Sequence, residues 1–306
     1  MKIILLISIN ILIHFSTFGQ NPNVSKDISA IVFLDSFVVT ATKRGFNVKD
    51  FIDIVQQDES FYRAFHNLRF QPHIAENSIE ILNRKNNIQA ANYHTTEQFV
   101  EGNCRTMKYL KEEIKGKFYK KKQERKHLYY TARMHEQVFL TKGKVCGNKD
   151  YASITRNNLS GIDKHINELK KLIFQPGKAV EVPFIGGKTA IFEEKMIKYY
   201  NFYISSKMVG DSIDCFVFQA VVKPNISTNK TIIKYLETYF AKTDFQVIAR
   251  NYHLKYNSLF DFDVKMKVDL IQFDEKYLPA RVSYQGNWKI PTQRRERVQF
   301  LIDFKY

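Results

Sequence analysis

The chain is poor in several residue types on which specialised architectures depend. Its 306 residues include one Trp, three Cys, seven Pro and 12 Gly. So few Gly and Pro residues exclude collagen-like and low-complexity architectures. Acidic residues are also scarce, with 31 against 47 basic ones, and the formal net charge is +16. A hydrophobic content of 44% excludes a disordered chain, and the length suits one large domain or two small ones.

Motifs that carry catalysis or metal binding are missing as well. The sequence has no His-Glu-x-x-His, no Cys/His zinc spacing and no Gly-x-Ser-x-Gly elbow. Gly186-Gly-Lys-Thr189 lacks the earlier Gly and the preceding strand that a phosphate loop needs. Asp261, Asp263 and Asp269 share one strand face, but lysines stand between them, which favours a neutralised surface ladder over a calcium site. We therefore expect no enzymatic activity, no cofactor and no metal.

Only one long apolar run occurs, and it lies at the N-terminus. Lys2 precedes an apolar stretch over residues 3–13, and the small residue Gly19 follows in a cleavage-like context. This pattern is typical of a secretory signal peptide over residues 1–20, and the run is short for a membrane span. We expect export to the periplasm or to the periplasmic face of the outer membrane. The mature chain, 21–306, then forms a single β-rich domain with a possible internal boundary near 175–188.

The three cysteines permit one disulfide in an oxidising compartment. Cys104 and Cys146 both lie near glycines, and a bond between them is allowed but not required by the sequence. An odd count leaves at least one cysteine free or paired between chains. Cys215 lies in an apolar strand pattern, which is typical of a small buried residue.

The clearest pattern in the chain is the strict alternation over residues 261–270. Asp261, Asp263, Lys265, Lys267 and Asp269 alternate with apolar residues, namely Phe262, Val264, Met266, Val268 and Leu270. Side chains alternate faces along a strand, so this pattern predicts a strand with one dry and one wet face. Neighbouring stretches repeat it and are separated by polar turns. The fold class we expect is α+β and β-rich: a curled antiparallel sheet, an open half-barrel, with two or three helices packed on its concave face.

Other elements follow from periodicity and from turn residues. Residues 103–118 fit a strand or a helix, and Gly286-Asn287 indicates a turn. We expect helices over 48–68 (interrupted at 58–60), 160–173 and 190–200, and strands over 29–42, 128–140, 214–222, 231–240, 244–256, 278–284 and 297–306.

The strand sequences of the C-terminal part resemble those of the LolA/LolB-like periplasmic lipoprotein carriers. The segments that carry this resemblance are 216–222, 231–240, 245–250 and 277–284. It implies an open, incomplete antiparallel barrel with helices on its concave side. The whole chain is also similar to uncharacterised secreted proteins of Bacteroidetes-type bacteria, on the segments 38–52, 101–107 and 139–147. That second resemblance implies no activity.

These observations favour a non-enzymatic envelope protein that binds a lipid or another apolar ligand between sheet and helices. The ligand-binding face is expected to include Phe216, Phe218, Phe262, Val264, Met266 and Val268. One alternative is a scaffold or adaptor at the outer membrane whose apolar face is filled by its own side chains. Another is an outer-membrane β-barrel, because the final strand alternates and ends in the aromatic Tyr306.

Basic residues are concentrated in two stretches, 115–126 and 294–297, which we interpret as solvated hairpin tips. An exported basic protein meets few nucleic acids, so none is expected as a partner. An anionic membrane surface or an acidic envelope protein fits the charge better.

Overall fold

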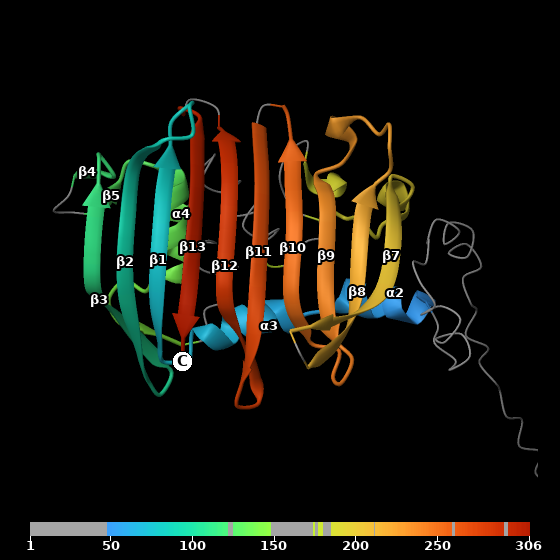
Figure 1. The fold of residues 1–306 in the computed structure, drawn as a ribbon, viewed down its shortest axis with the longest axis horizontal. Helices are drawn as coiled ribbons and strands as arrows, with labels where there is room; N and C mark the ends of the chain where they lie inside the picture. The colour runs from blue at the N-terminus through green and yellow to red at the C-terminus, as the bar shows by residue number, and fades with distance from the viewer. Residues whose placement is uncertain are drawn as a thin grey trace, which may run out of the picture.

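The dominant element of the protein is one large, open antiparallel sheet of 11 strands (Figure 1). The computed structural model describes residues 48–121, 125–147, 174, 177–179, 185–210, 212–258, 261–290 and 293–306. The strand order is β6-β3-β2-β1-β13-β12-β11-β10-β9-β8-β7. The bounds are β1 His73–Leu82, β2 Ile88–Glu101, β3 Cys104–Lys115, β6 Val145–Cys146, β7 Tyr200–Val209, β8 Ile213–Val222, β9 Ile233–Ala241, β10 Val247–Tyr256, β11 Asp261–Phe273, β12 Lys276–Lys289 and β13 Glu296–Lys305.

Strand pairing brings the first and the last strand of the described chain, β1 and β13, together inside the sheet. β7 to β13 are consecutive neighbours, and β13 then pairs with β1 in a register that sets Ile79 opposite Phe300. The predicted alternation in β11 is confirmed, because Met266 is 4% exposed while Lys265 beside it is exposed. The sheet thus has an inner face toward the helices and an outer face that carries charged residues.

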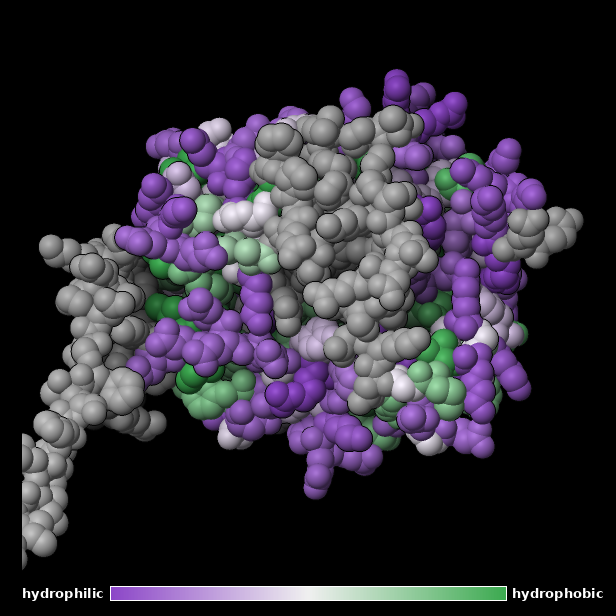
Figure 2. Space-filling view, turned by 180° about the vertical axis from the view of Figure 1, so that it is seen from behind, coloured by the Kyte–Doolittle hydropathy of each residue, from purple (hydrophilic) through white to green (hydrophobic). Residues whose placement is uncertain are grey.

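Three helices of nine or ten residues pack on the inner, concave face. They are α2 (Val48–Gln57), α3 (Ser60–Leu68) and α4 (Tyr130–Phe139). α2 and α3 run behind the lower part of the sheet, and α4 lies behind β1 and β13 (Figure 1). Seen from this side, hydrophobic surface lies in patches between hydrophilic residues (Figure 2). The predicted fold class is therefore confirmed: a curled, open antiparallel sheet with helices on its concave face.

The α2–α3 elbow is fixed to the sheet by a buried ion pair. Asp58 accepts hydrogen bonds from the backbone N–H and the hydroxyl of Ser60 at 3.0 and 2.6 Å, and its Oδ2 lies 3.3 Å from an Arg250 nitrogen. The Arg250 guanidinium also lies over the Phe61 ring, 4.3 Å from its centroid. The Ser60 hydroxyl accepts a further bond from the Val247 N–H. This network explains why the helical pattern breaks at residues 58–60.

The prediction of a strand over 128–140 is wrong, because this segment forms α4. Tyr130, Met134 and Val138 follow helical spacing and are buried against the sheet. The Glu296 carboxylate accepts hydrogen bonds from the N–H groups of Tyr130 and Thr131, at 2.9 and 3.1 Å, and so caps the helix from another part of the chain. A cap that comes from residue 296 leaves no local signal in the helix's own sequence.

Two further predictions in the C-terminal half need correction. Within 190–200 only α6 (Glu194–Ile197) is an α-helix, and Tyr200 already begins β7, a strand that the sequence reading missed. Gly286 is not in a turn, because β12 continues through it to Lys289. A Cβ at Gly286 would lie 2.5 Å from the Tyr284 hydroxyl, so glycine makes room there for a neighbouring aromatic side chain.

The remaining elements are short. β4 (Tyr119–Lys121) and β5 (Lys126–His127) form a separate two-stranded hairpin. Two short 3-10 helices are η2 (Gly186–Lys188) and η3 (Thr228–Lys230). The ambiguous stretch 103–118 is a strand, β3. The expected signal segment 1–20, strand 29–42, helix 160–173 and half of the boundary region 175–188 lie outside the described residues.

The cysteines occupy two different environments. Cys104 and Cys146 pair across β3 and β6 and are joined by a disulfide with a sequence separation of 42. Cys215 is free and buried on the outer face of β8, where it packs with Ala241 and Ile248. The buried position agrees with the sequence prediction for Cys215.

Candidate functional site

The six residues predicted to bind an apolar ligand all lie on the inner face of the sheet. Phe216 and Phe218 come from β8, and the other four come from β11. Five of the six are at most 4% exposed, while Phe216 is only partly buried. β9 and β10 separate the two groups, so the residues belong to one broad face rather than to one compact pocket.

Aromatic contacts show how this face is covered within the described chain. The Phe216 ring lies 5.5 Å from the Phe51 ring of α2, and the Phe262 ring lies 4.9 Å from Trp288. The Tyr252 hydroxyl lies 2.7 Å from the Met266 sulfur. A ligand between sheet and helices would therefore have to replace contacts of this kind, beginning at the partly exposed Phe216.

The inner face changes character at the other end of the sheet. Along β2, side chains at every second position point inward and are polar: Asn92, His94, Thr96 and Gln98, each at most 4% exposed. α4 and the β4–β5 hairpin lie over this part of the sheet (Figure 1). Polar side chains cost free energy when they are buried without partners. Their presence here marks the inner face of β2 and β3 as a polar section, whereas β1 contributes Ala75, Ile79 and Ile81 to the apolar core that continues across β8–β13.

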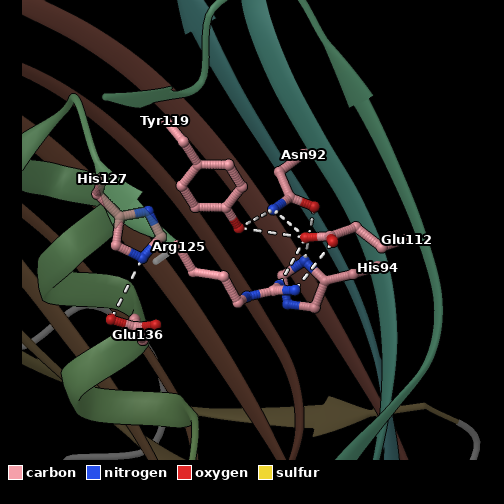
Figure 3. Close-up of polar contacts among 7 residues, drawn as sticks. All are labelled: Asn92, His94, Glu112, Tyr119, Arg125, His127 and Glu136. Carbon is pink, nitrogen blue, oxygen red and sulfur yellow. Dashed lines mark hydrogen bonds and ion pairs between the residues drawn. The ribbon is translucent and has the colours of Figure 1, made fainter. Parts of the chain in front are cut away.

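Glu112 is the centre of the polar section (Figure 3). Its Oε1 accepts hydrogen bonds from Asn92 (2.9 Å), Tyr119 (3.1 Å) and Arg125 (2.6 Å), and its Oε2 accepts a second bond from Arg125 at 3.0 Å. Burial by itself raises the pKa of Glu112, but the bonds from Asn92 and Arg125 outweigh burial and hold the pKa below its usual value. Glu112 is thus an ionised carboxylate whose charge is compensated by Arg125.

A second acidic group reaches the polar section from α4. Glu136 lies 3.2 Å from His127 (Figure 3). The Lys142 ammonium lies 2.8 Å from the same carboxylate. Burial raises the pKa of Glu136, yet contacts with His127 and Lys142 reverse that effect and lower it. The two carboxylates therefore each carry their own basic partners.

Within the described part of the chain, several buried polar atoms here have no hydrogen-bond partner. They include His94 Nε2, Thr96 Oγ1 and both ring nitrogens of His135. The His94 and His135 rings are 6.1 Å apart, and His135 also lies 5.1 Å from the Phe300 ring. Burial lowers the pKa of His94 to about 4 and that of His135 well below its usual value, so both imidazoles are neutral near pH 7. A neutral imidazole offers one donor and one acceptor.

The sequence reading missed the polar section, although a signal for it was present. Asn92, His94, Thr96 and Gln98 form a period-two pattern in which the polar residues, not the apolar ones, face inward. Their partners Glu112 and Arg125 lie in stretches that looked like ordinary charged surface. Only the pairing of β2 with β3, which sets His94 opposite Glu112, brings them together.

Two other classes of site were sought in the described part of the chain. Among these residues, no group of three or more His, Cys, Asp or Glu side chains is arranged to hold a metal ion. None of the helices described there has the length and apolar character that a membrane crossing requires. On the outer face, the aspartates of β11 form ion pairs, for example Asp263 with Lys255 at 2.9 Å and Asp269 with Lys267 at 3.2 Å.

No known protein family and no curated protein matches the sequence. Among solved structures, the chain is similar to a putative outer membrane lipoprotein-sorting protein domain from Vibrio parahaemolyticus, with 6% identity, a TM-score of 0.28, and coverage of 82% of this chain and 92% of that one. It is also similar to the LolA superfamily protein NE2245 from Nitrosomonas europaea, with 8% identity, a TM-score of 0.24, and coverage of 81% and 91%.

A third similar structure is a DUF1329 family protein from Desulfovibrio piger, with 12% identity, a TM-score of 0.22, and coverage of 81% and 92%.

Proposed function

We propose that this chain is an exported, non-enzymatic envelope protein that binds a lipid or another amphiphile between the sheet and its helices. The observation that carries the proposal is the amphipathic inner face. It is mainly aromatic and aliphatic across β1 and β8–β13 and polar across β2 and β3, and one continuous sheet joins the two sections. An amphiphile has the same division between an apolar chain and a polar head.

The unpartnered atoms of the polar section add support. Buried polar groups in folded proteins are generally hydrogen-bonded to protein, water or a ligand. His94 Nε2, Thr96 Oγ1 and the His135 nitrogens lack hydrogen-bond partners among the residues that the structure describes. A hydroxyl or ester group can supply both the donors and the acceptors that neutral imidazoles need. In this proposal the apolar chain lies against Phe216, Phe218, Phe262, Val264, Met266 and Val268.

Titration with a fluorescent fatty acid, together with native mass spectrometry of the protein purified from its host, tests the proposal. Phe216→Glu places a charge at the partly exposed end of the apolar section and should weaken binding at least tenfold. Gln285→Glu is the matched control, because this substitution adds the same charge at a residue that is exposed on the outer face. No co-purified lipid, no fatty-acid binding, or equal loss in both variants would reject the proposal.

A second candidate function is a scaffold or adaptor without a ligand. The observation that favours it is the low exposure of five of the six apolar residues, which the chain's own side chains cover. Cross-linking in the envelope separates the two functions, since an adaptor gives one dominant protein partner and a carrier gives several or none.

A further inference from the structure

The connections between strands lie alternately at the two rims of the sheet. Because neighbouring strands are antiparallel, each connection lies at the opposite rim from the one before it. At the top of Figure 1 are the connections that contain residues 83–87, 116–118, 223–232, 257–258 and 293–295, which we call the upper rim. The connections that contain residues 102–103, 210, 212, 242–246 and 274–275 form the lower rim.

Charge differs sharply between the two rims. The upper-rim connections contain no acidic residue, and their basic residues are Arg84, Lys85, Lys117, Lys223, Lys230, Arg294 and Arg295. The β4–β5 hairpin adds Lys120, Lys121 and Lys126 at the same rim, with Glu124 the one acidic residue of its sequence. The described residues of the lower-rim connections include one basic residue, Lys242, and three acidic ones, Asp244, Asp274 and Glu275.

The upper-rim charges are available to a partner. Lys85, Lys117, Lys230 and Arg294 are exposed, and no acidic side chain in the described residues pairs with them. Arg295 is the exception, since it pairs with Asp261. At about 4.8 Å between neighbouring strands, the eight steps from β3 to β8 extend the row of charges over about 40 Å along the sheet.

We propose that the upper rim docks the protein on an anionic phospholipid surface. The outer face does not compete for this role, because its charges are mixed in sign and largely paired, as in Arg281 with Asp303 and Lys255 with Asp263. The docking surface is independent of the proposed ligand binding.

A membrane fits this rim better than an acidic protein does. The charges come from separate short turns and form a long, single-signed row without an apolar centre, whereas protein interfaces usually have a well-packed apolar core. An anionic leaflet attracts each nearby Lys or Arg with roughly a fivefold gain in partitioning and needs no shape complementarity. The attraction is screened by salt over a Debye length of about 8 Å at physiological ionic strength.

Vesicle sedimentation with the full mature chain tests this inference. We expect binding to vesicles of phosphatidylcholine with 30 mol% phosphatidylglycerol, weaker binding in high salt, and little binding to pure phosphatidylcholine. The triple variant Lys85→Glu, Lys230→Glu, Arg294→Glu alters three separate turns of the upper rim. It should lose at least tenfold in partitioning.

The control carries the same change in net charge at the lower end of the sheet: Lys144→Glu, Lys276→Glu, Lys305→Glu. It should stay within about threefold of the wild type, and circular dichroism should show both variants folded. Equal losses in the two variants would mean that net charge alone acts and would overturn the inference. So would a wild-type protein that does not distinguish anionic from neutral vesicles. Fatty-acid binding, measured separately, should be unchanged in the upper-rim variant.

Discussion

At the scale of single residues, the register of a strand determines whether a side chain is buried on the inner face or exposed on the outer face. Met266 is 4% exposed and contacts the Tyr252 hydroxyl, while Lys265 next to it in the chain lies on the outer face. A one-residue slip in a strand would exchange every such pair. The alternation in β11 therefore fixes which side chains line the proposed site.

Met266→Lys should destabilise the protein by several kcal/mol, because it buries an ammonium group without a partner. Lys265→Met, on the wet face, should change the free energy of unfolding by less than about 0.5 kcal/mol. Thermal or urea unfolding of the two variants measures the difference. A larger loss in Lys265→Met would show that the assigned inner face is the outer one.

Acid should destabilise the polar section through His94. Its pKa in the folded protein is about 4, below the ordinary value of 6.5, so the unfolded chain binds the proton more tightly. Stability is then greatest above pH 6.5 and falls as the pH drops toward 4, by about 3 kcal/mol from this residue. Glu112 and Glu136, with lowered pKa values, act in the same direction at lower pH.

Urea unfolding of the wild type and His94→Gln at pH 7, 6, 5 and 4 checks this prediction. The variant should show a shallower dependence on pH between 6.5 and 4, while Lys265→Met should keep the wild-type dependence. An unchanged slope in His94→Gln would contradict the assigned environment of the imidazole.

At the scale of elements, the short helices depend on contacts from distant parts of the chain. α4 is capped by Glu296, which is 8% exposed although it lies within the basic stretch 294–297. Burial raises the pKa of Glu296, an effect that the bonds from Tyr130 and Thr131 only partly offset. The interpretation of 294–297 as a solvated tip thus holds for Arg294 and Arg295, which are exposed, and fails for Glu296.

Glu296→Ala should destabilise the fold by about 1–2 kcal/mol, because two backbone N–H groups of α4 lose their acceptor. Arg294→Ala, two residues away and exposed, should be close to neutral. Chemical denaturation compares them, and hydrogen exchange should show faster exchange confined to α4 in Glu296→Ala. Equal stability of the two variants would remove Glu296 from its capping role.

At the scale of the whole molecule, an open sheet leaves two edges that need support. The disulfide between Cys104 and Cys146 closes a 42-residue separation and ties the short edge strand β6 to its neighbour β3. Between these cysteines lie β4, β5 and α4, which cover the polar section. The crosslink therefore restricts the part of the chain on which the polar section depends.

Removing the crosslink with Cys104→Ser and Cys146→Ser should cost about 4 kcal/mol by loop entropy. Dithiothreitol should lower the melting temperature of the wild type and leave that of the double variant unchanged. A reductant effect of equal size in both proteins would show that the disulfide does not act as assigned.

The sequence by itself determined the sheet and its two faces. Strict alternation, as in Val264, Lys265 and Met266, is compatible only with a strand that has one buried face. The polar turns between such runs predict an antiparallel meander. The elbow at residues 58–60 and the buried Cys215 were also visible locally. Strand β7 and α4 were not, because their stability comes from contacts with β8 and with Glu296 rather than from their own patterns.

Only the tertiary structure determined where the polar cluster and the basic rim of the sheet lie. Glu112 and Arg125 form one polar cluster with His94, because strand pairing places His94 opposite Glu112. The positions of these residues in the sequence do not indicate this contact. Likewise, Lys85, Lys230 and Arg294 lie at one rim because antiparallel strands return every second connection to the same side. The number of charges can be read from a sequence, but strand pairing and strand direction determine which charges lie close together.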